Sequence, residues 1–170
     1  MAKEYLEREV SLSLNEYDNV WSLKIPDSPH NRSIARPFDF LVIVEGKPIA
    51  IECKQTSSLT SFPLDNIRPH QVQSLLFFEK TGGTSYLFVN FRTKGKSSRV
   101  FAVSMQQLVQ WYFFESRKSI PFTFFNEETI ELPRKKFEKG VYGWDFSGML
   151  PEARLKRKGE MQLTLGREQV

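Results

Sequence analysis

Two short runs of β-forming residues, Phe38 to Val44 and Ile49 to Lys54, are separated by the sequence Glu45-Gly46-Lys47-Pro48. Because glycine accepts a positive φ without steric cost, this spacing predicts a tight antiparallel hairpin. If Glu45 and Gly46 are the two turn residues, residue 44 pairs with 47, 43 with 48 and, further along, 39 with 52. A hairpin with a defined register is the feature that most constrains the fold.

Three charged residues, Asp39, Glu52 and Lys54, lie inside these otherwise apolar runs. The register places Asp39 directly opposite Glu52, and the alternation of side chains along a strand places Lys54 on the same face as Glu52. Two opposed carboxylates repel each other unless a positive group lies between them, and a divalent cation fits that position. The hairpin therefore predicts two carboxylates and one ammonium group at one end of a sheet.

Such a cluster suits phosphodiester hydrolysis. Hard cations such as Mg²⁺ bind through one or two carboxylates, water and substrate phosphate oxygens. The ion polarises the phosphate and lowers the pKa of a bound water, while Lys54 orients that water or neutralises the transition state. The spacing alone is explained equally well by an ordinary salt-bridged cluster of Asp39, Glu52 and Lys54 at a sheet edge.

The remaining segments predict an α/β fold with a mixed sheet, because helices and strands alternate along the chain. Pro69 suits the first position of a helix, and Ser104 is a typical N-cap. The predicted helices are Ala2 to Asn15, Pro69 to Lys80 and Met105 to about Ser116, and the further strands are Val20 to Leu23, Tyr86 to Phe91 and Val100 to Val103.

The length of 170 residues and the 40% hydrophobic content predict one domain, residues 1–150, followed by a basic tail, residues 151–170, which we expect a partner to order. No apolar run approaches the roughly 18 residues of a membrane span, and the N-terminus is charged where a secretory signal is apolar. The single cysteine, Cys53, excludes an internal disulfide framework and is expected in the core. We therefore expect a cytoplasmic protein that does not bind membranes.

The net charge of +4 is modest, but its distribution is uneven. Basic residues outnumber acidic ones between residues 134 and 158, and a second basic group lies in a loop that contains Gly and Ser. Such clusters suit DNA backbones, because neutralising phosphates releases counterions, although a solvated surface explains either cluster alone equally well. The candidate DNA-binding residues are Arg92, Lys94, Lys96, Arg99, Arg134, Lys135 and Lys136.

The string RPFDFLVIVEGKPIAIECKQTSSLTSFPLDNIRPHQVQSL, followed by GGTSYLFVNFR, resembles the RecU-type Holliday junction resolvases of the PD-(D/E)XK nuclease superfamily. The later strings QQLVQWYFF and RKSIPFTFF are also similar to that family. The resemblance covers roughly Arg36 to Phe125. It implies a restriction-endonuclease-like core, a central mixed sheet flanked by helices in the order αβββαβ, and Mg²⁺ as the cofactor, with Mn²⁺ as the alternative.

The resemblance also implies roles for individual residues. Asp39 and Glu52 would be metal ligands, Lys54 the catalytic lysine, and Gln71 a residue near the active site. Apart from the resemblance, His70 has no partners for a zinc site, and we interpret it as a helix-start residue or a DNA contact. The first helix of such nucleases often contributes a carboxylate, and the best match is Glu7, with Glu9 as the alternative. The family implies a homodimer that nicks four-way DNA junctions in pairs, encoded by a bacterium or phage and acting in the host cytoplasm.

Two alternatives remain open. The segment from Lys24 to Arg36 is shorter than the stalk of family members, which favours a restriction-like, end-processing or repair endonuclease that acts on other DNA. A DNA-binding recombination accessory protein that has lost cleavage is the third hypothesis. The aromatic residues from Trp111 to Phe114 are interpreted as core or dimer interface rather than as a surface for stacking bases.

Overall fold

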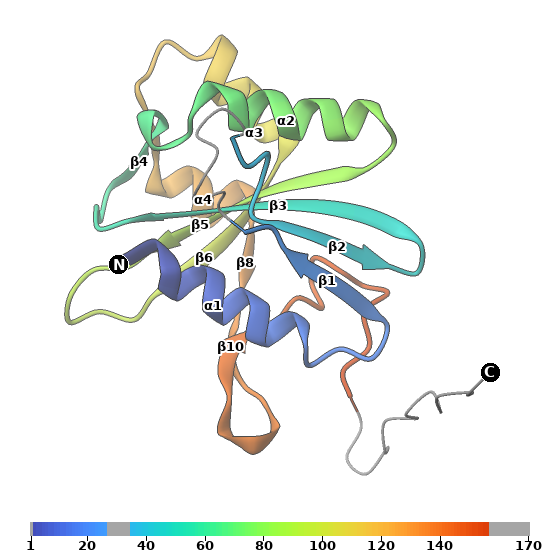
Figure 1. Ribbon diagram of the computed structural model, residues 1–170. Helices are drawn as coiled ribbons and strands as arrows, with labels where there is room; N and C mark the ends of the chain where they lie inside the picture. Colours follow the sequence, from blue (N-terminus) through green and yellow to red (C-terminus); the bar gives the residue numbers. More distant parts are fainter. Residues whose placement is uncertain (1, 27–34, 157–170) are drawn as a thin grey trace.

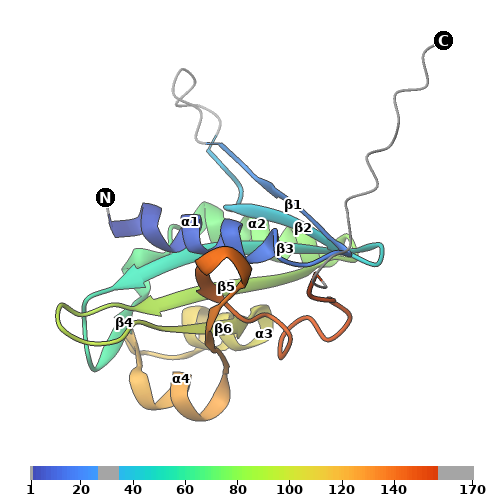
Figure 2. The same ribbon diagram turned by 90° about the horizontal axis from the view of Figure 1, so that it is seen from below.

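The computed structural model describes residues 2–26 and 35–156 of the chain. A six-stranded sheet lies between helices: α1 (Ala2–Leu14) covers one face, and α2 (Pro69–Lys80), α3 (Met105–Val109) and α4 (Phe122–Glu128) cover the other (Figure 1; Figure 2). The elements in chain order are α1 (Ala2–Leu14), β1 (Val20–Lys24), β2 (Phe40–Val44), β3 (Lys47–Thr56), β4 (Ser61–Pro63), the 3₁₀ helix η1 (Leu64–Asn66), α2 (Pro69–Lys80), β5 (Thr84–Phe91), β6 (Arg99–Ser104), α3 (Met105–Val109), the π-helix η2 (Gln110–Phe114), β7 (Ser119–Pro121), α4 (Phe122–Glu128), β8 (Ile130–Leu132), β9 (Arg134–Lys136), the 3₁₀ helix η3 (Glu138–Gly140) and β10 (Tyr142–Trp144).

The strands of the main sheet are ordered β1-β2-β3-β5-β6-β8. The β3–β5 pair is parallel and its neighbours are antiparallel, so the sheet is mixed. The parallel pair is joined through α2, which covers one face of the sheet, as a crossover connection requires. The order α1-β1-β2-β3-α2-β5 confirms the predicted αβββαβ core, with β4 and η1 inserted before α2.

The β2–β3 hairpin has the predicted register. Val44 pairs with Lys47, and the pairing continues without a slip to Phe40 opposite Ile51. Glu45 and Gly46 are the two turn residues, with φ of 49° and 78°. A positive φ at both positions is typical of the hairpin turn whose twist matches that of the strands. The ladder therefore brings the residues just before β2 beside the middle of β3.

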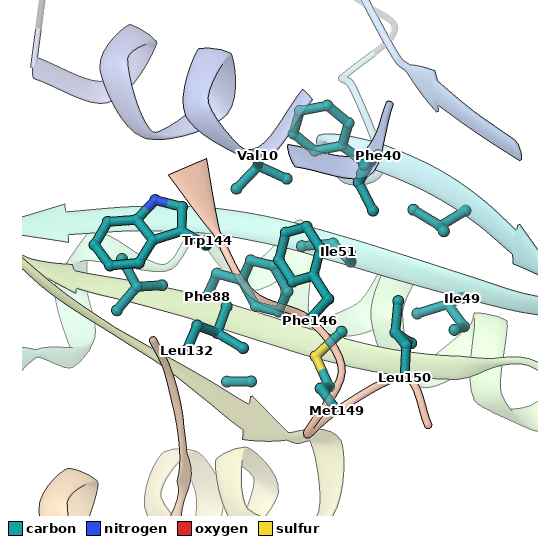
Figure 3. Close-up of a cluster of buried hydrophobic side chains, with 14 of the residues drawn as sticks. Val10, Phe40, Ile49, Ile51, Phe88, Leu132, Trp144, Phe146, Met149 and Leu150 are labelled. Atoms are coloured by element: carbon teal, nitrogen blue, oxygen red, sulfur yellow. The ribbon is translucent and has the colours of Figure 1, made fainter. Parts of the chain in front are cut away.

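Two hydrophobic cores lie on the two faces of the sheet. On one face, α1 contributes Leu6, Val10 and Leu14, whose four-residue spacing forms one stripe of a helix. Figure 3 shows this core, where Trp144 and Phe146 from the C-terminal part cover the sheet. The ring of Phe146 stacks on Phe88 of β5, with centroids 5.8 Å apart. On the other face, α2, α3 and α4 cover the same strands.

The segment after α3 differs from the prediction of one continuous helix to about Ser116. The α-helical pattern ends at Val109, and a π-helical turn follows, in which the Glu115 N–H donates to the Gln110 carbonyl at 3.1 Å. Ile120 and Pro121 belong to β7, which pairs with β4. The strands β4 and β7 to β10 are three residues each, too short for an alternating pattern to show in the sequence.

The residues after β10 return to the start of the sheet. The Tyr17 hydroxyl donates to Asp145 at 3.2 Å and accepts from the Phe146 N–H at 2.8 Å, and Leu155 forms a β-bridge with Tyr17. The sequence predicts a basic tail over residues 151–170. The structure describes residues 151–156 of this segment, and residues 157–170 lie outside the described residues. Within the described ranges, no helix combines the length and the apolar character that crossing a bilayer requires.

Candidate active site

Asp39 and Glu52 are fully buried side by side at the end of the hairpin. The Asp39 N–H donates to the Ile51 carbonyl at 3.0 Å, and Asp39 Oδ2 accepts from the Cys53 N–H at 2.7 Å. Asp39 is thereby held by its backbone N–H at Ile51 and by its carboxylate at Cys53, the residues on either side of Glu52. The register that the structure gives ends with Phe40 opposite Ile51, and Asp39 bonds to the residues on either side of Glu52, so both carboxylates belong to the same end of the hairpin. Cys53 is buried in the core as expected.

Lys54 and Gln71 complete a closed group with Glu52. Lys54 Nζ lies 2.9 Å from Glu52 Oε1 and donates to Gln71 Oε1 at 2.8 Å, while Gln71 Nε2 donates to Glu52 Oε1 at 2.5 Å. Gln71 lies in the first turn of α2, which begins with Pro69 as predicted. All three side chains are buried, so these contacts form in a site of low dielectric constant, where each is stronger than it would be in water.

Arg36 joins a third carboxylate to this cluster. Its Nη2 forms an ion pair with Asp39 and lies 3.5 Å from Glu7 Oε1, and its Nη1 donates to the Ile25 carbonyl at 3.0 Å. The Arg36 side chain is 9% exposed. Lys24 Nζ lies 2.8 Å from the other oxygen of Glu7. Sequence reasoning missed Arg36, although it stands in the RPFD string three residues before Asp39.

The alternative carboxylate on α1 points elsewhere. Glu9 forms an ion pair with Arg134 at 2.9 Å and accepts from Trp144 Nε1 at 3.1 Å. Glu7 therefore belongs to the group around Asp39, and Glu9 belongs to the contact between α1 and β10.

The donor chemistry of this site fits a hard divalent cation. Three buried carboxylates, Glu7, Asp39 and Glu52, offer oxygen ligands, and Mg²⁺ commonly uses one or two carboxylates with water and phosphate oxygens. Within residues 2–26 and 35–156, no group of three or more His, Cys, Asp or Glu side chains is arranged to hold a metal ion. Glu7 and Asp39 are connected through Arg36, which lies between their carboxylates.

The basic loop between β5 and β6 lies apart from the carboxylates in sequence. Lys94 and Lys96 are exposed, and the Arg92 guanidinium lies over the Tyr5 ring of α1, 5.0 Å from its centroid. Arg99 is paired with Glu131 through two hydrogen bonds of 2.7 and 2.6 Å, and this bonding to a carboxylate raises the pKa of the Arg99 guanidinium.

The other predicted DNA-binding residues lie on the β9–β10 hairpin and on α2. Figure 1 shows this hairpin, in orange, projecting beside α1. Arg134 pairs with Glu9, Lys135 lies 2.9 Å from Asp145, and Lys136 lies over the Tyr142 ring, 5.4 Å from its centroid. His70 is half-buried next to Gln71 in the first turn of α2.

Sequence comparisons with known proteins agree on one family. The family model described as "Recombination protein U" (RecU) matches residues 32–140. A Holliday junction resolvase RecU from Ureaplasma parvum is 35% identical over 97 residues, which cover 55% of this chain and 53% of the relative. Another, from Pediococcus pentosaceus, is 32% identical over 103 residues, which cover 59% of this chain and 50% of the relative. The chain thus spans about half the length of these curated relatives.

Among solved structures, the Holliday junction resolvase Hjc from Archaeoglobus fulgidus aligns with 75% of this chain and 94% of its own, with a TM-score of 0.48 and 16% identity. The sequence comparison is the more specific finding. Because the family model matches well over half of its residues, the chain belongs to the RecU family.

Proposed function

We propose that this chain is a metal-dependent, structure-selective DNA endonuclease that resolves four-way junctions by paired phosphodiester hydrolysis in recombination and repair. The observation that carries the proposal is the buried group of Asp39, Glu52, Lys54 and Gln71. Burying so many charged groups costs free energy, and such costly clusters are typical of functional sites. The RecU relatives, which are named as Holliday junction resolvases, support the choice of substrate.

The proposed site assigns a task to each side chain. Asp39 and Glu52, with Glu7, would hold Mg²⁺ or Mn²⁺, which when bound polarises the scissile phosphate and lowers the pKa of a water. Lys54 is held by Glu52 and Gln71, so its ammonium group is preorganised to orient the attacking water or to offset negative charge in the transition state. Gln71 acts by positioning these two groups.

We further propose that the chain acts as a homodimer on twofold-symmetric junctions, in the cytoplasm of a bacterial or phage-infected cell. Lys94 and Lys96 are exposed, so they can reach DNA phosphates. The further DNA contacts proposed are Arg92, Arg99, His70 and the hairpin residues Arg134, Lys135 and Lys136.

A cleavage assay tests the proposal. A labelled four-way junction, a duplex of the same sequence and a single strand are each incubated with Mg²⁺ or EDTA at one salt concentration. We expect paired, symmetric nicks in the junction alone, lost in EDTA. Equal cleavage of the duplex would favour a restriction-like or repair endonuclease. Binding of the junction without metal-dependent cleavage would favour a DNA-binding accessory protein that does not cleave.

A further inference from the structure

A pocket of about 380 Å³ lies where α2 begins, and three of its lining residues are cationic. Arg68 contributes from the residue before α2, and Arg117 and Lys118 contribute from the segment between η2 and β7. Asp65 is the single acidic residue of the lining, and Tyr112 is its aromatic residue. The lining therefore carries a net positive charge.

The three cations differ from most other basic groups described above. Arg36, Arg99, Arg134 and Lys135 each face a carboxylate. Across the described residues, by contrast, neither Arg68 nor Arg117 nor Lys118 forms an ion pair, and all three side chains are exposed. Three cations and one carboxylate around a concave surface favour an anionic ligand.

The two walls of the pocket are fixed to each other. The Leu64 N–H donates to the Lys118 carbonyl at 2.9 Å, and Pro63 pairs with Ser119 in the β4–β7 ribbon. Leu64 and Ile67 are buried beneath the wall that carries Arg68. The three cations thus project from one connected scaffold, and little backbone ordering would be needed for them to act on one ligand.

The pocket is also connected to the candidate active site. The Arg68 N–H donates to Gln71 Oε1 at 3.1 Å, and Gln71 in turn donates to Glu52. The start of α2 therefore contributes to both places, with Gln71 in the catalytic group and Arg68 and Pro69 in the lining of the pocket. A DNA strand with its scissile phosphate at Asp39 and Glu52 would carry neighbouring phosphates past this turn.

We propose that this pocket binds one backbone phosphate of the strand being cut, close to the scissile phosphate, with the adjoining sugar against Tyr112. The inference rests on the proposed function and extends it to three DNA contacts, Arg68, Arg117 and Lys118. Phosphate contacts of this kind fix the position of a strand without reading its sequence. The pocket therefore sets which phosphodiester lies over the carboxylates.

Phosphate-ethylation interference tests the pocket. An end-labelled four-way junction, ethylated at about one phosphate per strand, is bound by the full chain in EDTA, and bound and free DNA are sequenced. We expect ethylation of one phosphate near the cleavage position to block binding by the wild type but not by Arg117→Ala/Lys118→Ala. All other interfering positions should be unchanged in that variant. The slope of log affinity against log salt should fall in magnitude by about 1.

A matched variant, Arg8→Ala/Lys80→Ala, removes two exposed positive charges elsewhere and should retain the wild-type interference pattern. Thermal melting checks that the variants fold, and Arg117→Ala alone replaces the double variant if that one does not. The pocket is overturned if the pocket variant keeps the complete wild-type pattern, if the wild type shows no interfering phosphate near the cut, or if the matched variant changes equally.

Cleavage of the same junction in Mg²⁺ is measured in parallel. Loss of the single interfering position, together with an absence of metal-dependent cleavage by the wild type, would support the pocket and overturn the proposed function. Normal metal-dependent cleavage by the wild type, together with an interference pattern that the pocket variant leaves unchanged, would support the proposed function and overturn the pocket.

Discussion

Gln71 Nε2 donates a 2.5 Å hydrogen bond to Glu52 Oε1, which ties the first turn of α2 to the middle of β3. The same amide accepts from Lys54 Nζ at 2.8 Å. A neutral amide can serve both charges at once, because its NH₂ group donates and its carbonyl oxygen accepts. The position of α2 therefore determines how the carboxylate and the ammonium group are oriented.

Replacing Gln71 by Ala should lower the cleavage rate by about 10- to 100-fold, because Glu52 and Lys54 lose the group that orients them. The free energy of unfolding should fall by about 1–3 kcal/mol, since a buried carboxylate and a buried ammonium group each lose a hydrogen bond. Single-turnover cleavage and urea unfolding measure the two effects. Gln73→Ala, at an exposed position of the same helix, is the control and should change the unfolding free energy by less than about 0.5 kcal/mol.

Replacing Asp39 by Asn should abolish metal-dependent cleavage and leave junction binding within about threefold of the wild type, because binding rests mainly on contacts with phosphates. The Asn side chain keeps an oxygen for the Cys53 N–H but lacks the charge that a divalent cation requires. Cleavage gels and fluorescence anisotropy with the same junction measure both. Asp18→Asn, at an exposed position, should cleave normally; rapid cleavage by Asp39→Asn in Mg²⁺ would contradict the assigned role.

The hairpin and its charged residues could be predicted because their determinants are local. The Glu45-Gly46 turn fixes the register, and the two-residue period then places Asp39, Glu52 and Lys54. Pro69 marks the start of α2, which places Gln71 in its first turn. These signals lie within short stretches of sequence and do not depend on how distant elements pack.

The role of Arg36 could not be predicted, because its partners come from separate elements. Arg36 stands in an irregular segment, and it meets Glu7 only because α1 packs across the sheet beside β1. The choice between Glu7 and Glu9 depends on the rotation of α1, which is set by its buried stripe and by Trp144. Trp144 comes from the end of the domain, so no local pattern connects it to α1.

Replacing Arg36 by Gln should lower the free energy of unfolding in EDTA by about 3 kcal/mol, because Asp39 would lose a buried ionic partner. If Asp39 and Glu7 are metal ligands, Mg²⁺ should raise the melting temperature of this variant more than that of the wild type, since the guanidinium group no longer competes with the ion. Urea unfolding and thermal melting with and without Mg²⁺ measure these effects. Arg8→Gln is the exposed control, and an equally small loss in both variants would contradict the structural role of Arg36.

Replacing Gly46 by Ala tests the turn separately from the site. Gly46 has a φ of 78°, and a Cβ there would meet no atom within 4 Å, so the cost is one of backbone conformation. An L-residue in this region costs about 1–2 kcal/mol, which urea unfolding should detect. Gly148→Ala, where a Cβ would lie 3.9 Å from Ile130, should change stability by less than about 0.5 kcal/mol. A rate of cleavage that falls in Gly46→Ala well below its melting temperature would show that the turn also distorts the site.

Asp145 connects the C-terminal residues to the start of the sheet, and its pKa gives this contact a defined pH dependence. Burial opposes the shift, but hydrogen bonds from Ser147 and Lys135 outweigh it and lower the Asp145 pKa from 3.8 to about 2. A lowered folded-state pKa stabilises the fold above the unfolded-state pKa, and this contribution is lost as the pH falls from about 4 towards 2.

Asp145→Asn should therefore lower the free energy of unfolding at pH 7 by about 1 kcal/mol, a value reduced for solvent screening of this partly exposed pair. The difference from the wild type should be constant between pH 7 and pH 5 and should shrink steadily below pH 4, because the wild-type carboxylate then begins to protonate. Urea unfolding at intervals between pH 7 and pH 3 measures the difference. Asp18→Asn, at an exposed position, should show no such trend, and a difference for Asp145→Asn that stays constant down to pH 3 would mean that the carboxylate charge does not stabilise this contact.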